Sequence, residues 1–182
     1  MNKRYIPATA GMHYNPKIKG EKYMYTLNCY CTPLIGEVYM MNFTGDAHEQ
    51  AGWRPGVVLQ NNIGNANSSN VIVVPLTSAI KKTNQPTHVV ITAEESGLDM
   101  DSMVLCENPK TIAKTKIGRY MTRLSAEQMR QIAIASTVAT SAISYLTITE
   151  LFDVWLQTIR LNRKVEYMGE VYQNFGGLYE VR

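Results

Sequence analysis

The sequence predicts a β-rich α+β fold, in which a small antiparallel barrel is closed by a C-terminal helix and followed by an extra helical extension. One observation is a series of short apolar runs that recur about 12 to 17 residues apart, a spacing typical of small antiparallel barrels. A second is a pair of helix-start signals in the last third of the chain. The third is size, because 182 residues that are 45% hydrophobic provide for one sizeable core and an appended subdomain.

These patterns divide the chain into three regions. Residues 1–33 are polar, contain several prolines and show no sustained periodicity, which predicts an N-terminal arm. Residues 34–139 hold the apolar runs and the first helix signal, and we expect them to form the barrel domain. Residues 140–182 are expected to form a C-terminal helical extension, for which the sequence indicates no role.

Each expected strand of the barrel domain is a short apolar run. Runs bounded by Gly, Asn or Pro are typical of buried strands. A polar loop over residues 45–50 follows the first strand, and we expect Arg54 to lie in front of the second strand, which Pro55 opens. That strand ends in an Asn-rich segment over residues 61–65. The expected strands cover residues 37–43, 57–59, 71–74, 88–91 and 103–106.

Two helices are expected after the strands. Ser125 and Gln128 have the spacing of a capping box, and apolar residues recur on one helical face after them. Thr147 and Glu150 have the same spacing and open the second helix, whose apolar stripe begins at Leu151. A stripe at helical spacing is usually a packing face and seldom a ligand site.

The charge of the chain is mildly basic. The net charge is +3, the isoelectric point is about 8.7 and 18% of the residues are charged. This permits nucleic-acid binding through a local patch, but it differs from the dense positive charge of polybasic proteins.

Cysteine usage and hydropathy indicate a soluble, cytoplasmic protein with no metal, no cofactor and no membrane partner. Three cysteines are too few, and odd in number, for a secreted disulfide scaffold. Cys29 and Cys31 form a C-x-C pair, but no second pair completes a tetrahedral zinc site. No targeting segment is visible, and residues 132–148, the longest weakly polar stretch, are too polar to span a bilayer.

Arg54 is the strongest candidate for chemistry on a phosphate. When RNA is cleaved without a metal, the 2′-hydroxyl attacks its own phosphate, and the enzyme must stabilise a dianionic phosphorane. A guanidinium suits this task because its planar fork makes bidentate contacts with phosphate oxygens. Pro55 restricts residue 54 to extended conformations and so fixes the direction of the side chain. The alternative is a surface arginine that pairs with Glu37 or Glu49.

Thr77 and His48 are the next candidates. Thr77 follows an apolar run at a strand end, where its hydroxyl can bond a phosphate oxygen or order the 2′-hydroxyl, with Ser78 beside it. A threonine at a strand end is also an ordinary β-residue. His48 lies in the polar loop, and an ordinary histidine pKa of about 6.5 allows proton transfer near neutral pH. The alternative for His48 is a solvated loop histidine.

The order of these motifs resembles the MazF/PemK/Kid family of type II toxins over residues 35–139. The family pattern runs from a polar loop through G-x-R-P, an apolar strand, Q-N and a second apolar strand to T-S. The matching segments here are residues 36–39, 49–62, 63–65, 77–78, 86–89, 101–105 and 111–112.

The resemblance implies an SH3-like barrel, as in the MazF, PemK and CcdB toxins, and a homodimer. It implies sequence-specific cleavage of single-stranded RNA, mRNA in particular, without a metal, leaving a 2′,3′-cyclic phosphate and a 5′-hydroxyl. It also implies a cognate antitoxin as partner, with DNA reached only indirectly through that antitoxin.

By the same resemblance, Arg54 and Thr77 are expected to be catalytic, and His48 is added as a candidate because of its histidine chemistry and its place in the polar loop. Trp53, beside the arginine, is expected either to stack on an unpaired base or to be partly buried in the core. Lys110 stands where the family has an arginine, so bidentate geometry is lost there. Arg119 and lysines after the third and fifth strands add positive charge for a phosphate backbone. The expected RNA-binding residues are Glu49, Gln50, Trp53, Asn61, Ser78, Lys81, Lys82 and Lys110.

Two alternatives to an RNA-cleaving toxin stay open. One is a non-nucleolytic toxin of the same fold that binds a protein target such as DNA gyrase. The other is a catalytically weak, regulatory member of the family, which the Lys110 departure and the long extensions allow. The arginine–proline and threonine–serine steps favour the ribonuclease, because a pure interaction surface needs neither.

Overall fold

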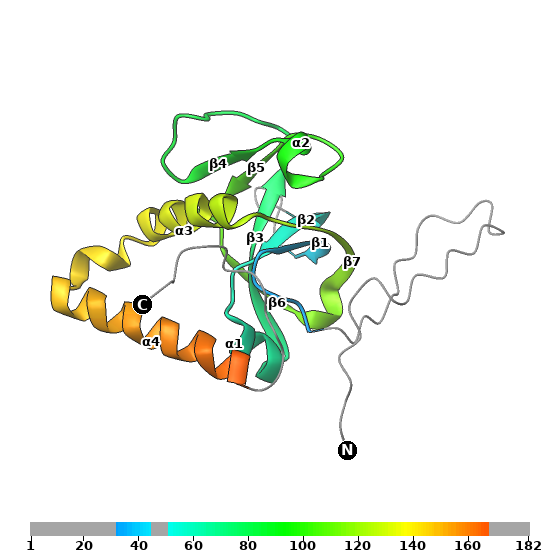
Figure 1. Ribbon diagram of the computed structural model, residues 1–182. Helices are drawn as coiled ribbons and strands as arrows, with labels where there is room; N and C mark the ends of the chain where they lie inside the picture. The colour runs from blue at the N-terminus through cyan, green and yellow to red at the C-terminus, as the bar shows by residue number, and fades with distance from the viewer. Residues whose placement is uncertain (1–31, 45–50, 168–182) are drawn as a thin grey trace, which may run out of the picture.

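The computed structural model describes residues 32–44 and 51–167, with side chains up to residue 161. Seven strands and a small number of helices make up these residues (Figure 1). The strands are β1 (Glu37–Phe43), β2 (Gly52–Val58), β3 (Asn70–Thr77), β4 (His88–Ile91), β5 (Ser102–Leu105), β6 (Lys110–Ala113) and β7 (Ile117–Arg123).

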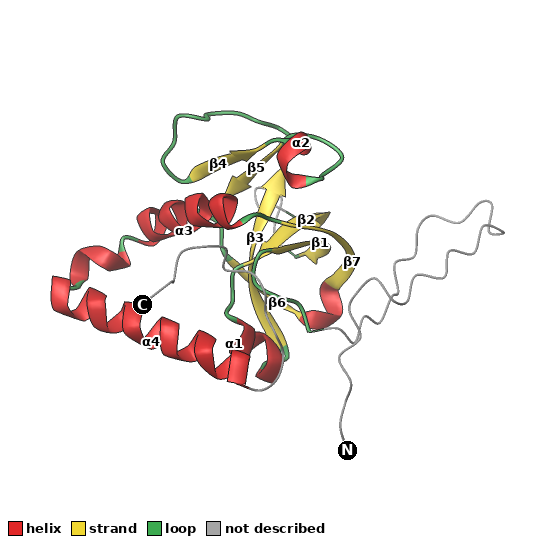
Figure 2. Cartoon of the chain, in the orientation of Figure 1, coloured by secondary structure: helices red, strands yellow, loops and turns green. Residues whose placement is uncertain are grey.

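The helices are short except for the last two (Figure 2). In the described part of the chain they are α1 (Asn62–Asn67), α2 (Ala93–Ser96), α3 (Ala126–Thr140) and α4 (Ile148–Tyr167), with 3₁₀ turns η1 (Lys114–Lys116) and η2 (Ala142–Tyr145).

All strand pairs are antiparallel, and the sheet runs in the order β4-β5-β3-β2-β1-β7, with β6 also paired to β3. β3 therefore bridges two halves of the sheet: its first residues, Asn70–Val73, pair with β6, and its last, Leu76 and Thr77, pair with β5. The sheet is not closed on itself, but its antiparallel order and its helices confirm the predicted β-rich fold class.

The core has two parts, one on each face of the central strands. Val57 and Val58, neighbours in β2, are both fully buried but belong to different hydrophobic clusters. Val57 packs in the cluster that α3 covers through Ile132, whereas Val58 packs with Met41 on the other face. Burial on both faces explains why these strands read as continuous apolar runs and show no alternation.

Several sequence-based boundaries are confirmed. β1 and β4 cover the predicted residues 37–43 and 88–91, and α3 begins with the predicted capping box. In the box before α4, the Thr147 backbone N–H donates to a Glu150 carboxylate oxygen at 2.7 Å.

Two expectations about elements were wrong. β2 begins at Gly52, so Arg54 and Pro55 lie inside the strand and not in front of it. Among the described strands, β1 alone pairs with β2 at Pro55, because pairing with β3 begins at Gly56, and a proline is tolerated on such an edge. The Asn-rich segment forms α1, which Asn61 caps.

β6 and β7 were also missed. Their sequences, Lys-Thr-Ile-Ala and Ile-Gly-Arg-Tyr-Met-Thr-Arg, contain no apolar run. Both strands exist because β3 and β1 offer them unpaired edges, which is a tertiary effect.

α4 lies beyond the sheet and returns along the molecule so that it contacts α1 (Figure 1). Its exposed residues include the aromatic pair Phe152 and Trp155, whose ring centroids are 5.5 Å apart. Among the described residues, no helix is long and apolar enough to cross a membrane. The division of the chain at residues 33 and 139 stays a prediction, and almost all of the N-terminal arm lies outside the described residues.

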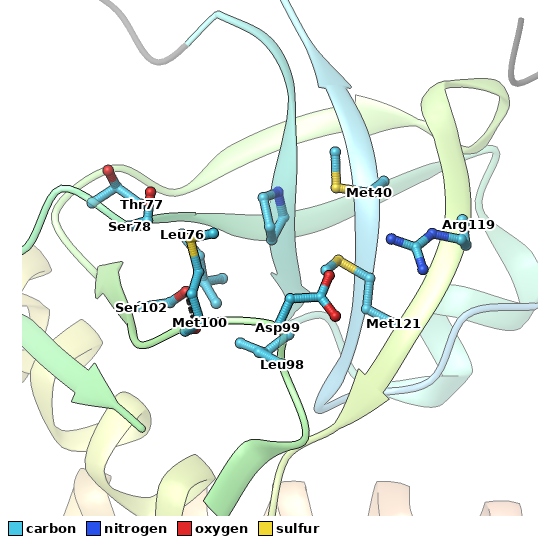
Figure 3. Close-up of a pocket in the computed structure, with 11 residues that line it drawn as sticks. Met40, Leu76, Thr77, Ser78, Leu98, Asp99, Met100, Ser102, Arg119 and Met121 are labelled. Carbon is cyan, nitrogen blue, oxygen red and sulfur yellow. Dashed lines mark hydrogen bonds between the residues drawn. The ribbon is translucent and has the colours of Figure 1, made fainter. Parts of the chain in front are cut away.

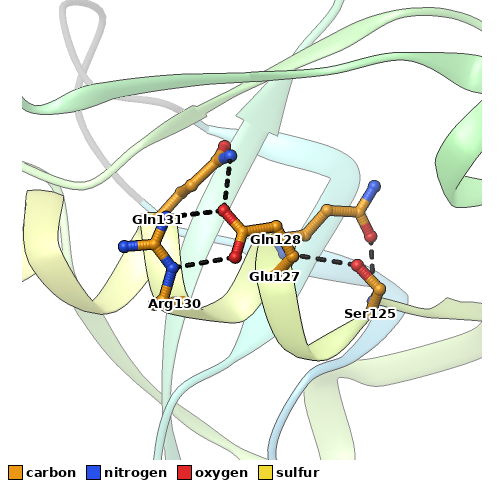
Figure 4. Close-up of polar contacts among 5 residues, drawn as sticks. All are labelled: Ser125, Glu127, Gln128, Arg130 and Gln131. Carbon is orange, nitrogen blue, oxygen red and sulfur yellow. Dashed lines mark hydrogen bonds and ion pairs between the residues drawn. The ribbon is translucent and has the colours of Figure 1, made fainter. Parts of the chain in front are cut away.

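The first turns of α3 carry a compact polar network (Figure 4). Ser125 Oγ accepts from the Gln128 backbone N–H at 3.2 Å, and the Gln128 side chain accepts from the Ser125 N–H at 2.8 Å. Glu127 accepts two bonds from the Arg130 guanidinium, at 2.7 and 2.8 Å, and one from Gln131 at 3.2 Å. The Arg130 bonds, followed by that from Gln131, lower the pKa of the Glu127 carboxyl to about 2.

We expect Glu127→Gln to lower stability slightly at neutral pH but not in acid. A depressed folded-state pKa stabilises the fold above the ordinary value of 4.5, and this contribution is lost as the pH falls toward about 2. The effect is small because the pair is fully exposed to solvent. Urea unfolding of both proteins at pH 7 and again near pH 2 measures it, and a stability difference that does not change with pH would contradict the assignment.

Candidate active site

A pocket of about 310 Å³ opens on one face of the sheet (Figure 3). Its floor crosses β3, β2, β1 and β7, and its wall is the loop between α2 and β5. The residues that line it are Met40, Pro55, Leu76, Thr77, Ser78, Leu98, Asp99, Met100, Ser102, Arg119 and Met121.

Strand register explains why these side chains share one face. Met40 of β1 is paired with Pro55 of β2, so their side chains project on the same side of the sheet. β7 pairs with β1 through an irregular register, and both Arg119 and Met121 of this strand line the pocket. In Figure 3, Thr77 lies at one end of the pocket and Arg119 at the other.

Arg54 does not line the pocket, because it alternates with Pro55 along β2. It is paired with Met41 of β1 and is half-buried. Its Nη2 donates to the Ala51 carbonyl at 2.7 Å, while its buried Nε has no hydrogen-bond partner in the described part of the protein. The guanidinium is thus fixed through Nη2, while its buried Nε makes no hydrogen bond to a described residue.

Pairing of Arg54 with Glu37, one of the alternatives that the sequence left open, does not occur. Glu37 is itself buried, and its Oε2 accepts from the Leu34 N–H at 2.7 Å and the Tyr39 hydroxyl at 2.6 Å. The other alternative, Glu49, lies outside the described residues.

Thr77 is the last residue of β3, as predicted, and its side chain is half-buried. Its Oγ1 accepts from the Ala79 N–H at 3.1 Å, while Ser78 beside it is exposed. β2 and β3 are antiparallel and pair from Gly56 and Pro75 onward, so the start of β2, with Arg54, and the end of β3, with Thr77, lie at the same end of the pair. Both predicted residues therefore stand at the same end of the central strands.

The other predicted RNA-binding residues are more dispersed. Lys81 and Lys82 are exposed on the loop between β3 and β4, and Lys110 opens β6 opposite Val73. Asn61 lies beyond the opposite end of β2 from Arg54, and its side chain accepts from the Gly64 N–H at 2.9 Å. The structure therefore gives Asn61 a helix-capping contact and does not bring it near Thr77.

His48, Glu49 and Gln50 lie outside the described residues. The histidine that is described, His88, has its ring nitrogens 3.0 Å from the Lys82 carbonyl and 3.0 Å from a Glu107 carboxylate oxygen. It ties the start of β4 to two loops, which is a structural role.

Trp53 packs its ring edge against a glycine of β7. A Cβ on Gly118 would lie 2.8 Å from Trp53 Cζ3 and 3.0 Å from the Met40 carbonyl oxygen. The indole nonetheless stays 43% exposed, so both roles that the sequence left open for Trp53, partial burial and base stacking, remain compatible with its position.

We expect Gly118→Ala to displace Trp53 and lower stability by about 1–3 kcal/mol, because the new methyl group overpacks the contact. In a Trp155→Phe background Trp53 is the remaining tryptophan of the two in the chain, so its emission reports the shift directly. The Trp155→Phe protein is the control. Unchanged emission together with an unchanged melting temperature would contradict this packing.

No group of three or more His, Cys, Asp or Glu side chains gathers in the described residues in a way that could hold a metal ion. Cys106, the cysteine among them, is buried, and burial raises the pKa of its thiol to about 11. It is therefore a protonated core residue at neutral pH.

Comparison with known proteins identifies the fold and the family. Residues 35–138 match the family described as PemK-like, MazF-like toxin of type II toxin-antitoxin system. The chain is also 36% identical over 111 residues to endoribonuclease EndoA of Bacillus subtilis, across 60% of this chain and 96% of that protein. The chain belongs to the PemK-like, MazF-like toxin family.

Solved structures of PemK-like, MazF-like toxins share the fold. A mycobacterial endoribonuclease in complex with its cognate antitoxin is 25% identical, covering 60% of this chain and 96% of its own, with a TM-score of 0.50. Mycobacterium tuberculosis toxin MazF-mt6 is 26% identical over 58% of this chain and 96% of its own, with a TM-score of 0.50. MazF of Deinococcus radiodurans, 23% identical over 61% and 98%, matches in fold with a TM-score of 0.54.

The predicted family and the SH3-like fold class are thus confirmed. The prediction that the protein is an endoribonuclease is also supported, because the relatives whose names state an activity are endoribonucleases. Two charged residues that line the pocket received no specific role from the sequence. Asp99 received no role from the sequence, and Arg119 was read only as general positive charge, because a loop aspartate and an isolated arginine carry no local signal. α4 lies outside the matched residues.

Proposed function

We propose that this protein is the toxin of a type II toxin-antitoxin system and cleaves single-stranded RNA, mRNA in particular, at a specific sequence and without a metal. Family membership supports the toxin assignment, and relatives that are endoribonucleases support the activity. The observation that carries the chemistry is the Arg54 guanidinium, whose buried Nε has no partner among the described residues and which stands at the same strand end as Thr77.

In the proposed reaction the ribose 2′-oxygen attacks the adjacent phosphorus as its proton leaves to a base. The bond from phosphorus to the 5′-oxygen then breaks, and the leaving oxygen takes up a proton. The products are a 2′,3′-cyclic phosphate and a 5′-hydroxyl, so no redox step and no co-reactant is needed.

Arg54 would stabilise the charge that develops on the phosphorane oxygens. Because the guanidinium is already fixed, little reorganisation of the site is needed when the negative charge develops. This is electrostatic preorganisation. Thr77 would hydrogen-bond a phosphate oxygen or position the 2′-hydroxyl. His48 is the proposed proton carrier.

The RNA would follow the open face at this end of the sheet, with Trp53 available for stacking and Lys81, Lys82 and Lys110 for phosphate contacts. Because bases must be splayed out to be read by a protein surface, a single strand is the proposed substrate. The protein would form a homodimer and bind a cognate antitoxin. It would contact DNA only through that antitoxin.

Primer extension on a long RNA, incubated with the purified full-length protein in EDTA, tests the proposal. We expect discrete stops at a short recurring sequence, fragments whose new 5′ ends accept phosphate from a kinase without prior phosphatase treatment, and no stops with Arg54→Ala. Intact RNA with a folded wild-type protein would overturn the ribonuclease assignment and direct attention to a protein target such as DNA gyrase.

A further inference from the structure

The pocket beside Thr77 holds two unpaired charges of opposite sign. Asp99 and Arg119 both line it, and in Figure 3 the carboxylate and the guanidinium point into it from opposite sides. Both side chains are exposed, and neither makes a hydrogen bond or an ion pair with another described residue. Nothing in the described fold therefore requires this carboxylate or this guanidinium at these positions.

Most of the other residues that line the pocket are apolar. Met40, Leu76 and Met121 come from three strands of the floor, and Leu98 and Met100 flank Asp99 in the wall. Methionine side chains adapt to flat rings and make favourable sulfur–aromatic contacts. A volume of about 310 Å³ lies at the small end of ligand pockets and suits one planar ring system better than two.

We propose that this pocket binds a guanine base of the RNA substrate, with Asp99 accepting from N1–H and the N2 amino group and Arg119 donating to O6 and N7. The inference rests on the proposed function and deepens it, because it names the base that the site reads. Since Thr77 lies at one end of the same pocket, the guanine belongs to a nucleotide next to the cleaved bond.

The chemistry of the two side chains selects guanine among the four bases. A carboxylate with two free oxygens is best satisfied by two adjacent donors, and guanine alone presents a ring N–H and an amino group side by side. Cytosine and adenine present one amino group, and uracil one ring N–H. A guanidinium fork matches the O6 and N7 acceptors of guanine, the commonest specific arginine–base contact.

The test begins by mapping the wild-type cleavage sequence and then uses short RNAs in which one guanine is replaced. Inosine lacks the N2 amino group, and 7-deazaguanine lacks the N7 acceptor. With the wild-type protein, each analogue should slow cleavage about 10- to 100-fold, as expected for losing a hydrogen bond to a charged group. Asp99→Asn should remove the inosine penalty but keep the 7-deazaguanine penalty, and Arg119→Gln should do the reverse.

Glu94→Gln is the matched control, because it removes a nearby exposed carboxylate that does not line the pocket. It should leave both penalties unchanged. If the wild-type protein cleaves RNA but no guanine occupies a fixed position, or if the penalties persist in the matching variants, the guanine assignment is overturned while the ribonuclease stands. If the folded wild-type protein cleaves no RNA, both proposals are overturned together.

Discussion

Replacing Arg54 by alanine should reduce RNA cleavage by about 10²- to 10³-fold, the loss typical of one preorganised donor to a developing oxyanion. The side chain is half-buried in β2, and its Nη2 donates to the Ala51 carbonyl at 2.7 Å, which fixes the guanidinium in place. Single-turnover cleavage of a short RNA containing the mapped sequence measures the chemical step. Circular dichroism and the melting temperature establish that the variant is folded.

Two further variants separate charge from geometry. Arg54→Lys keeps the charge but loses the planar fork, so most of the loss should remain. Arg130→Ala removes an equal charge from α3, where the arginine pairs with Glu127 in solvent, and it should cleave at the wild-type rate. If Arg54→Ala cleaved RNA at the wild-type rate, the proposed role of this guanidinium would be refuted. The proposed toxin would then have no identified group to stabilise the phosphorane.

Replacing Phe43 by alanine should lower the free energy of unfolding by about 3–5 kcal/mol, a large part of the total for a domain of this size. Phe43 ends β1, is 1% exposed and lies across β2 where Gly56 has no side chain. A Cβ on Gly56 would stand 2.9 Å from Phe43 Cζ, so the ring already fills the space beside that backbone. Its removal leaves a cavity that neighbouring strands cannot close.

Urea unfolding and the melting temperature measure this loss, which corresponds to a fall of about 6 to 20 °C. Phe152→Ala is the matched control, because that phenylalanine lies on α4 and is 55% exposed. It should change stability much less. Equal losses for the two variants would show that the cluster around Phe43 is not the cooperative core of the barrel.

The sequence predicted those parts of the fold in which local signals and burial agree. β1 and β4 are recognisable because most of their residues are apolar. α3 is recognisable because Ser125 and Gln128 satisfy each other's backbone groups. β6 and β7 are strands only because β3 and β1 supply edges to pair with. α1 forms from Asn- and Gly-containing residues of low helix propensity, held by the Asn61 cap.

The same division applies to the site. Arg54 and Thr77 could be selected from sequence because a fixed arginine before a proline and a strand-end hydroxyl suit phosphate chemistry, and because the chain resembles a toxin family. Their placement at one strand end follows from the register of β2 on β3, which depends on pairing over long sequence distances.

The sequence by itself thus determined the family, the class of fold and the residues with intrinsic phosphate chemistry, since these depend on residue type and order. The tertiary structure alone decided that Asp99, from a loop, and Arg119, from a strand without an apolar run, face one pocket beside Thr77. The physical reason is that the pocket is assembled from several strands and a loop, so the sequence around either residue does not indicate that the other lies in the same pocket.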